Sequence, residues 1–270
     1  MDVNELISNL PNVAKDTLYR FFPRIDHSEY PKFVGYTWED CHMGTLGAGD
    51  LYLASEMAAK LGFRPGLKVL ELGAGNCLSS VYFAKEYQVA VFAADLWNSP
   101  DDNYQRAKDN GVDNLVIPMQ IDAKALPFPK NYFDCIFSMN SFFYFGTDDL
   151  YPSYLSSFLK TAGKLCIASP CYKTEIDSDT PKHLLYDSPE FRESLACHSP
   201  SWWHNHFNKT GKYRTIECEE HAKGRTFWMD SIRWQLESGR DIKDLSDDIR
   251  MLLLDEEELI TYFTLIAIKK

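Results

Sequence analysis

The sequence lacks the features that would direct a chain into a membrane or onto a nucleic acid. Its 270 residues contain no apolar run of bilayer-spanning length, and the start, MDVNELISNL, is acidic where a signal peptide is basic. Lys and Arg number 28 against 39 Asp and Glu, so the net charge is −11 and few phosphate contacts are expected. We therefore predict a cytoplasmic protein with no membrane span and no nucleic-acid partner.

Cysteine pairs and metal motifs are also scarce. The seven cysteines are scattered and include no CxxC pair, which is typical of reduced thiols. His198, His204 and His206 lie beside Cys197, but an HxH spacing on a helix points its two rings to different faces, and no carboxylate follows at ligand spacing. We predict no metal site. His204 is instead a candidate general base, with a packing or surface role as the alternative.

What the sequence does contain is a glycine turn around which the rest is organised. An apolar run at 69–72 predicts a buried strand, and a helical pattern begins a few residues later. Between them, Gly73 and Gly75 let the backbone turn sharply and approach a ligand closely. Glu71 ends this strand, where a buried carboxylate needs a cationic or hydrogen-bonding partner. A cationic ligand would supply that partner.

Two further predicted strands end in acids. The run 89–95 ends at Asp95, which lies 20 positions beyond Gly75, the spacing at which nucleotide-binding folds place a ribose-binding carboxylate. The run 115–122 ends at Asp122. Because ligands of open parallel sheets bind outside the carboxyl ends of the strands, these acids and the glycine turn predict one nucleotide site.

The phrases ELGAGN, AADLWNS and IDAKALPF resemble the motifs of the class I S-adenosylmethionine-dependent methyltransferases. Within that family, the phrases GDLYLASEM, AADLWNSPDDN and SFFYFG are similar to the small-molecule type, which is often grouped with the quinone-biosynthesis C-methyltransferases and the cyclopropane fatty acid synthases. Asn76 and Cys77 stand where Thr and Gly are more usual. The resemblance implies S-adenosyl-L-methionine as cofactor, with its amino end near Glu71, its ribose at Asp95 and its adenine at Asp122 and Ala123. The cofactor-binding residues predicted in this way are Glu71, Gly73, Ala74, Gly75, Asn76, Asp95, Leu96, Asp122, Ala123 and Asn140.

Later segments complete the predicted α/β fold. Strands are expected at 132–145, 163–170, 213–220 and 259–270, the last with the β-branched and aromatic content of a buried strand. The resemblance implies a Rossmann-like, seven-stranded mixed sheet of order 3-2-1-4-5-7-6, with strand 7 antiparallel and helices on both faces.

The chain divides into four predicted parts. Residues 1–50 hold an N-terminal helix and a cover loop, and 51–170 form the cofactor-binding core. Residues 171–212 form an insertion that shapes the substrate site, and 213–270 complete the same domain. In the cover loop, Tyr36, Trp38, His42 and Met43 are candidates for cofactor contact, with packing as the alternative. Asp50, at the end of this loop, is the predicted N-cap of the helix that follows.

The insertion and the start of the chain also carry predictions. The insertion is expected to hold helices that start at Ser188 and Ser199, and its Trp202 and Trp203 either wall a pocket or pack on the sheet. The N-terminal helix either caps an acceptor pocket or simply packs on the domain.

The predicted activity is transfer of a methyl group to a small-molecule acceptor by in-line displacement. Tyr144 and Asn140, at the end of the fourth strand, and His204 are the candidates for orienting or deprotonating the acceptor. The alternatives are a non-catalytic S-adenosylmethionine-binding module and an NAD(P)-dependent oxidoreductase, although Leu78 stands where a dinucleotide motif has its third glycine. The protein is expected to be a monomer or homodimer.

Overall fold

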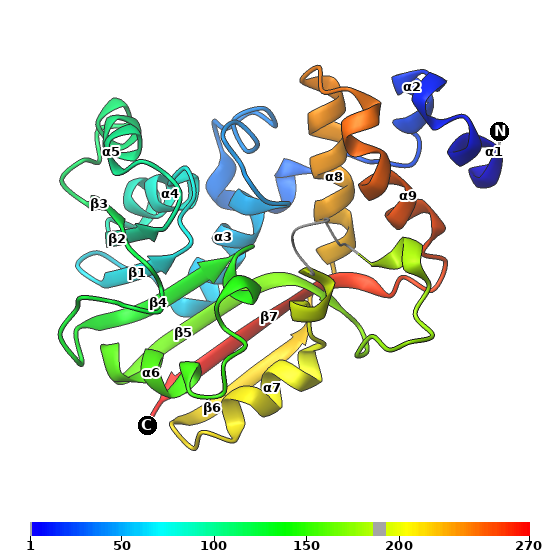
Figure 1. Ribbon diagram of the computed structural model, residues 1–270. Helices are drawn as coiled ribbons and strands as arrows, with labels where there is room; N and C mark the ends of the chain where they lie inside the picture. Colours follow the sequence, from blue (N-terminus) through cyan, green and yellow to red (C-terminus); the bar gives the residue numbers. More distant parts are fainter. Residues whose placement is uncertain (1, 186–192) are drawn as a thin grey trace.

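A computed structural model describes residues 2–185 and 193–270 of the chain. Its centre is one seven-stranded sheet of order β3-β2-β1-β4-β5-β7-β6, in which β7 runs antiparallel to both of its neighbours (Figure 1). The strands are β1 (Lys68–Leu72), β2 (Ala90–Asp95), β3 (Val116–Gln120), β4 (Phe133–Met139), β5 (Leu159–Tyr172), β6 (Tyr213–Glu220) and β7 (Ile260–Lys269). The predicted fold and strand order are confirmed.

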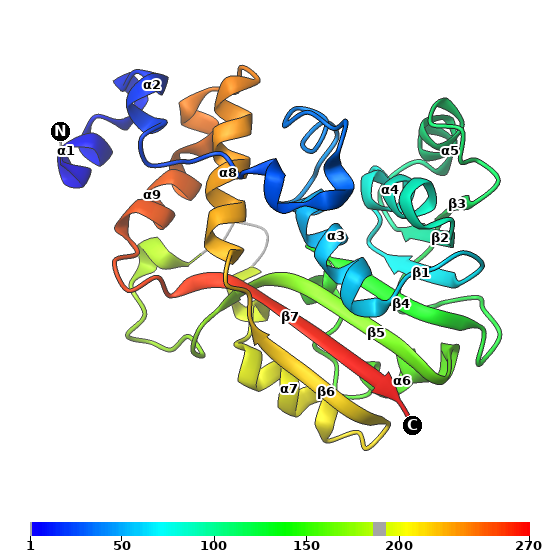
Figure 2. The ribbon, with the colours of Figure 1, turned by 180° about the vertical axis from the view of Figure 1, so that it is seen from behind.

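Helices cover both faces of this sheet (Figure 2). They are α1 (Val3–Ser8), α2 (Lys15–Leu18), α3 (Asp50–Leu61), α4 (Leu78–Tyr87), α5 (Pro100–Asp109), α6 (Tyr151–Phe158), α7 (Pro200–Asn208), α8 (Gly224–Glu237) and α9 (Ser246–Leu254). Because side chains alternate along a strand, Val69 packs toward α3 and α4 while Leu70 packs toward α6 and α7. Both faces of β1 are thus buried, as its continuous apolar sequence predicts.

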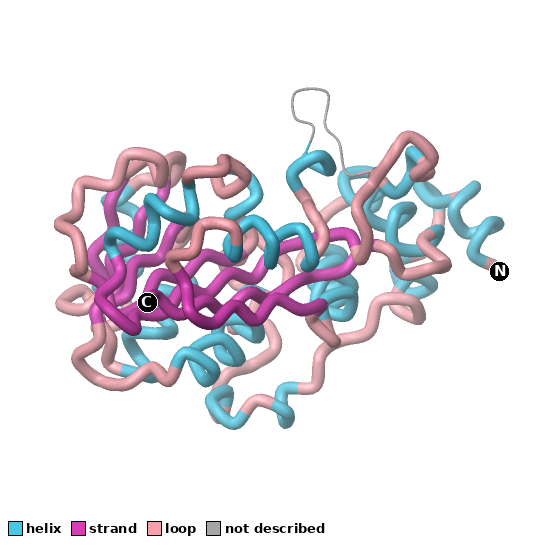
Figure 3. Tube along the Cα trace, turned by 90° about the horizontal axis from the view of Figure 1, so that it is seen from below, coloured by secondary structure: helices cyan, strands magenta, loops and turns pink. Residues whose placement is uncertain are grey.

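A third hydrophobic cluster lies beyond the sheet. Leu6 and Phe22 of the N-terminal segment pack against Ile232 of α8 and Leu252 of α9. Figure 3 shows these helices at the opposite end of the molecule from the C-terminus. Of the two predictions for the N-terminal helix, the structure shows packing on the domain.

Several predicted element ends shift. Gly49, in the left-handed conformation, precedes α3, so Asp50 is its first residue rather than its N-cap. The fourth strand stops at Met139 because Asn140 also turns left-handed, with a φ of 54°. Ser199 caps α7 as predicted, accepting a hydrogen bond from the Trp202 amide, whereas Ser188 lies outside the described residues.

Candidate functional site

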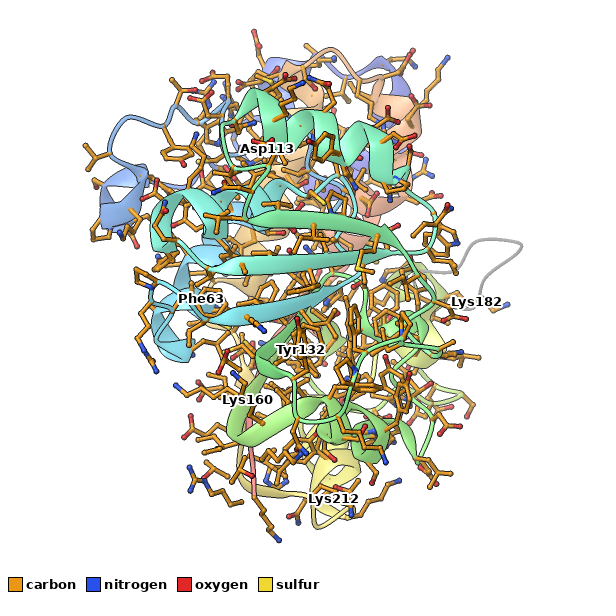
Figure 4. All side chains as sticks on the ribbon, turned by 90° about the vertical axis from the view of Figure 1, so that its left-hand side faces the viewer. Phe63, Asp113, Tyr132, Lys160, Lys182 and Lys212 are labelled. Carbon is orange, nitrogen blue, oxygen red and sulfur yellow. The ribbon has the colours of Figure 1, made fainter. Side chains whose placement is uncertain are left out.

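A cavity of about 420 Å³ opens at the carboxyl ends of β1, β2 and β4 and is the first of two adjoining cavities. In Figure 4, Phe63, which precedes β1, lies near the left-hand ends of the strands, and Lys182 lies near their right-hand ends. All ten predicted cofactor-binding residues line this first cavity, together with Tyr144: they are Glu71, Gly73, Ala74, Gly75, Asn76, Asp95, Leu96, Asp122, Ala123 and Asn140. The structure therefore brings together residues that lie between Glu71 and Tyr144 in the sequence.

The glycine turn forms the floor of the first cavity. Gly73 has a φ of 71°, and a Cβ atom there would lie 2.2 Å from Ser141 Oγ. Gly75 has a φ of 53°, and a Cβ atom there would lie 2.9 Å from a methyl carbon of Leu46. Cys77, where glycine is more usual, still adopts a φ of 57°. The turn thus keeps the close backbone approach that a ligand requires.

Glu71 brings a buried carboxylate to this cavity. Only 2% of its surface is exposed, and its two oxygens accept hydrogen bonds from the hydroxyls of Ser79 and Ser80. Burial, with a smaller contribution from the nearby carboxylates of Asp50 and Asp95, raises the pKa of Glu71 to about 7. A cationic group bound beside Glu71 would reverse this effect by favouring the ionised form.

Asp50 is a second carboxylate of the cavity, which the sequence analysis did not identify as a site residue. Its Oδ1 accepts a hydrogen bond of 2.6 Å from Asn140 Nδ2, and its Oδ2 accepts longer ones of 3.2 and 3.3 Å from the amides of Leu46 and Gly47. Burial raises the pKa of Asp50 to about 6. Its partner Asn140 is 90 residues away in the sequence. The position of Asp50 before an apolar helix therefore predicts only a capping role.

Asp95 holds the turn and the loop after β2 together. One carboxylate oxygen accepts from the Gly75 amide at 2.8 Å, and the other accepts from the amides of Trp97 and Asn98 at 2.9 Å. Asp122, at the far side of the cavity, is exposed and accepts from the Lys124 amide at 2.8 Å. Asp95 is therefore already well bonded, while Asp122 is more accessible to a ligand.

Two aromatic side chains stand at the rim of the first cavity. Tyr144 is 42% exposed and Trp97 is 69% exposed, and their rings meet edge to face at 5.6 Å. Trp97 therefore lines the cavity, as would be needed for contact with a bound nucleoside.

The cover loop, residues 31–50, contributes different residues from those predicted. Gly44, Leu46 and Gly47 line the first cavity, whereas Tyr36 and Met43 line a separate hollow beside α4. Asn76 ties the loop to the glycine turn by donating to the Gly44 carbonyl at 3.1 Å.

Trp38 and His42 of the same loop are buried elsewhere. The carboxylate of Asp230, on α8, accepts from Trp38 Nε1 at 2.9 Å and lies 2.7 Å from His42 Nε2. Asp230 also accepts from the Ile25 amide at 2.8 Å. These contacts hold the cover loop against α8. Trp38 and His42 therefore have a packing role, which was the alternative to cofactor contact.

Predicted residues of the insertion also fall outside the first cavity. His204 lies on α7, which packs against β6, and it lines neither this cavity nor its neighbour. Trp203 is fully buried and its ring stacks on Phe263 at 5.5 Å. The position of His204 therefore does not support a role as general base. Trp203 packs on the sheet, which is one of the two predictions made for it.

Membrane-spanning helices and metal clusters are not found in the described parts of the chain. Within residues 2–185 and 193–270, no helix combines the length and apolarity needed to cross a bilayer. In the same residues, no three His, Cys, Asp or Glu side chains are gathered as metal ligands would be.

Comparison with known proteins finds similarity to methyltransferases. Residues 69–163 match the family model described as a methyltransferase domain. Glycine/sarcosine/dimethylglycine N-methyltransferase of Actinopolyspora halophila is 24% identical over 176 residues, which cover 62% of this chain and 30% of that protein. Ubiquinone/menaquinone biosynthesis C-methyltransferase of Vibrio cholerae is 38% identical over 78 residues, which cover 28% of this chain and 30% of that protein. The chain thus spans under a third of the length of these two relatives.

A solved structure extends the fold comparison over the whole chain. Phosphoethanolamine N-methyltransferase 2 of Haemonchus contortus, in complex with S-adenosyl-L-methionine, superposes with a TM-score of 0.70 at 15% identity. The match covers 100% of this chain and 60% of that one. At this identity, the likeness establishes the fold.

Proposed function

We propose that this chain, whose residues 69–163 match the methyltransferase-domain model, is a class I methyltransferase that transfers a methyl group from S-adenosyl-L-methionine to a small-molecule acceptor. One observation carries the proposal. Four carboxylates line a cavity whose floor is a glycine turn at the carboxyl ends of parallel strands, and they are Asp50, Glu71, Asp95 and Asp122.

The residues of the first cavity fit this cofactor. S-adenosylmethionine carries an ammonium and a sulfonium cation, and the buried Glu71 gains a partner when a cation binds beside it. Gly73 and Gly75 line the cavity in a left-handed turn that has no room for a Cβ atom, so their backbone is open to a ligand. Asp122, exposed at the far side, has a carboxylate oxygen available for an adenine amine.

Each part of the first cavity then has a proposed role in holding the cofactor. The bound cofactor supplies a methyl group already activated on a sulfonium sulfur. Glu71 and the turn would hold the methionine end, Asp95 the ribose, and Asp122 with the Ala123 backbone the adenine. The cover loop, through Leu46 and Gly47, would exclude water from the transferring group. Positioning of this kind can supply several kcal/mol of the rate enhancement without a dedicated base.

Acceptor, compartment and assembly belong to the proposal as well. The two relatives are named for the methylation of small molecules, glycine and its derivatives in one case and quinones in the other. The seven cysteines are all free thiols, which supports a reducing compartment such as the cytoplasm. We propose a monomer or homodimer that does not act on nucleic acid, and light scattering after size exclusion would measure its mass.

Transfer of labelled methyl groups tests the proposed function. Purified protein is incubated with methyl-labelled S-adenosylmethionine and a small-molecule extract of bacterial cells, and label is counted in compounds other than the cofactor. We expect label to accumulate with the wild-type chain and not with Gly73→Val. Tight cofactor binding without any transfer would instead favour the non-catalytic binding module.

A further inference from the structure

A second cavity of about 260 Å³ adjoins the first. Leu46, Gly47, Asn140 and Tyr144 line both cavities, so they form the wall between them. Most of the rest of its lining comes from the end of β5, from Cys197 and from residues between 228 and 260, a segment that includes α9 and part of α8. Sites for drug-sized ligands usually exceed about 300 Å³. The second cavity is therefore suited to a smaller molecule than the cofactor.

Asn140 presents an unused hydrogen-bond acceptor at the shared wall. Its Nδ2 donates to the Ala48 carbonyl at 3.2 Å and to Asp50 Oδ1 at 2.6 Å, and these two acceptors fix the orientation of the amide. Its Oδ1 is buried and has no partner among the residues that the structure describes. A buried carbonyl oxygen left unpaired is unfavourable, so a ligand with an N–H or O–H group would satisfy it.

Arg240 places a cation on the lining of the second cavity. Its amide donates to the Gln235 carbonyl at 3.0 Å, and its carbonyl accepts from Lys15 Nζ at 2.8 Å, so its backbone is held in place. Its guanidinium donates to the side-chain oxygen of Gln235. Arg233 forms an ion pair with a carboxylate. Arg240 forms no ion pair within residues 2–185 and 193–270.

The remaining polar groups of the second cavity favour a ligand that is not purely anionic. Asp248 lines it and accepts from Trp228 Nε1 at 3.3 Å, and Ser231 and Gln235 add groups that can accept or donate. Guanidinium matches carboxylate and phosphate oxygens in geometry and charge, whereas the Asp248 carboxylate prefers hydrogen-bond donors.

We propose that the second cavity binds the methyl acceptor, and that this acceptor is a small acid, carboxylic or phosphoric, whose nucleophile is an amine or a hydroxyl. The acid group lies at Arg240, and the N–H or O–H group donates to Asn140 Oδ1. This inference rests on the proposed methyl transfer. In the reaction, the acceptor's lone pair forms the bond to the methyl carbon, the methyl–sulfur bond breaks with its electron pair going to sulfur, and the displaced proton passes to solvent.

Matched acceptor pairs test this acceptor class. Glycine is compared with glycinamide, and phosphoethanolamine with ethanolamine, so that the two pairs separate a carboxylate from a phosphate. The same small-molecule extract is treated with deuterated-methyl cofactor, and its products are identified by mass spectrometry. We expect the deuterated products to be acids that carry a methylated nitrogen or oxygen. Where a member of a matched pair reacts, we expect it to be the acid.

Two arginine variants provide the control. Arg240→Gln should raise the KM for the acid acceptor about tenfold or more while cofactor affinity stays unchanged. Arg250→Gln, on α9 and absent from the lining of both cavities, should leave both values as they are. Neutral or purely cationic products, or an unchanged KM in Arg240→Gln, would overturn the acceptor class while leaving methyl transfer intact. If no compound takes up label although the cofactor binds, the proposed function fails and the acceptor class with it.

Discussion

Replacing Glu71 by Gln is expected to stabilise the empty protein and to weaken cofactor binding. Burial raises the pKa of Glu71 from 4.5 to about 7, which corresponds to about 3 kcal/mol. Because the folded protein holds this proton more tightly than the unfolded chain does, the free energy of unfolding falls as the pH rises from about 4.5 to about 7 and then levels off. Gln keeps the shape of the side chain and hydrogen-bonding capacity toward Ser79 and Ser80, but it carries no charge.

Unfolding by urea, followed by circular dichroism at pH 4.5 and pH 8, measures the stability effect. The unfolding free energy of Glu71→Gln minus that of the wild type should grow by about 3 kcal/mol between these pH values. Asp50, whose pKa is raised to about 6, shifts both proteins in the same direction and largely cancels in the comparison. An equal difference at both pH values would show that Glu71 does not titrate as its burial implies.

Calorimetry with S-adenosylmethionine measures the binding effect. Loss of the carboxylate should weaken affinity by about 1.5–3 kcal/mol, since a charge-assisted hydrogen bond is removed. Wild-type affinity should rise as the pH rises through about 7, because the ionised form of Glu71 binds the cation, and Glu71→Gln should lose this component.

Asp134→Asn is the matched control for Glu71→Gln. Asp134 lies near the amino end of β4, away from both cavities, and accepts from the Lys68 amide at 2.9 Å and Lys160 Nζ at 2.7 Å. These bonds lower its pKa, so the substitution should destabilise the protein at pH 8 and leave cofactor affinity unchanged. Unchanged affinity in Glu71→Gln, or an equal loss in Asp134→Asn, would refute the assignment of Glu71 to the cofactor site.

Three further changes probe the same site. Asp95→Ala should weaken S-adenosylhomocysteine binding by about 1–3 kcal/mol in calorimetry, because both the ribose contact and the Gly75 amide bond are lost, and an unaltered affinity would remove Asp95 from the site. Gly73→Val should abolish cofactor binding while circular dichroism still reports a folded chain, since its side chain would collide with Ser141; parent-like binding would contradict this role of the turn. In hydrogen exchange, saturating S-adenosylhomocysteine should slow the amides of Leu46 and Gly47, whose bonds to Asp50 are 3.2 and 3.3 Å long, whereas equal rates with and without ligand would make the cover loop fixed structure.

The sequence predicts the parts of this site that depend on local pattern. Glu71, the glycines and Asp95 follow from apolar runs, turn residues and spacing within one βαβ unit, and β6 falls at Tyr213–Glu220 as expected. The full strand order came from the family resemblance rather than from the pattern itself.

Contacts between distant segments could not be predicted in the same way. Asp50 meets Asn140 across 90 residues, and His42 meets Asp230 across 188. No local periodicity encodes such pairs, so the sequence predicts a helix cap at Asp50 and leaves cofactor contact and packing open for His42. His204 was assigned a catalytic role from its chemistry, although the packing of α7 on β6 keeps it out of both cavities.

A crystal structure of the protein with S-adenosylhomocysteine tests the cofactor site most directly. We expect the ligand in the first cavity, with its amino group beside Glu71, its ribose hydroxyls at Asp95 and its adenine amine at Asp122. A ligand bound elsewhere, or bound in this cavity with its adenine at the glycine turn, would contradict the assignment.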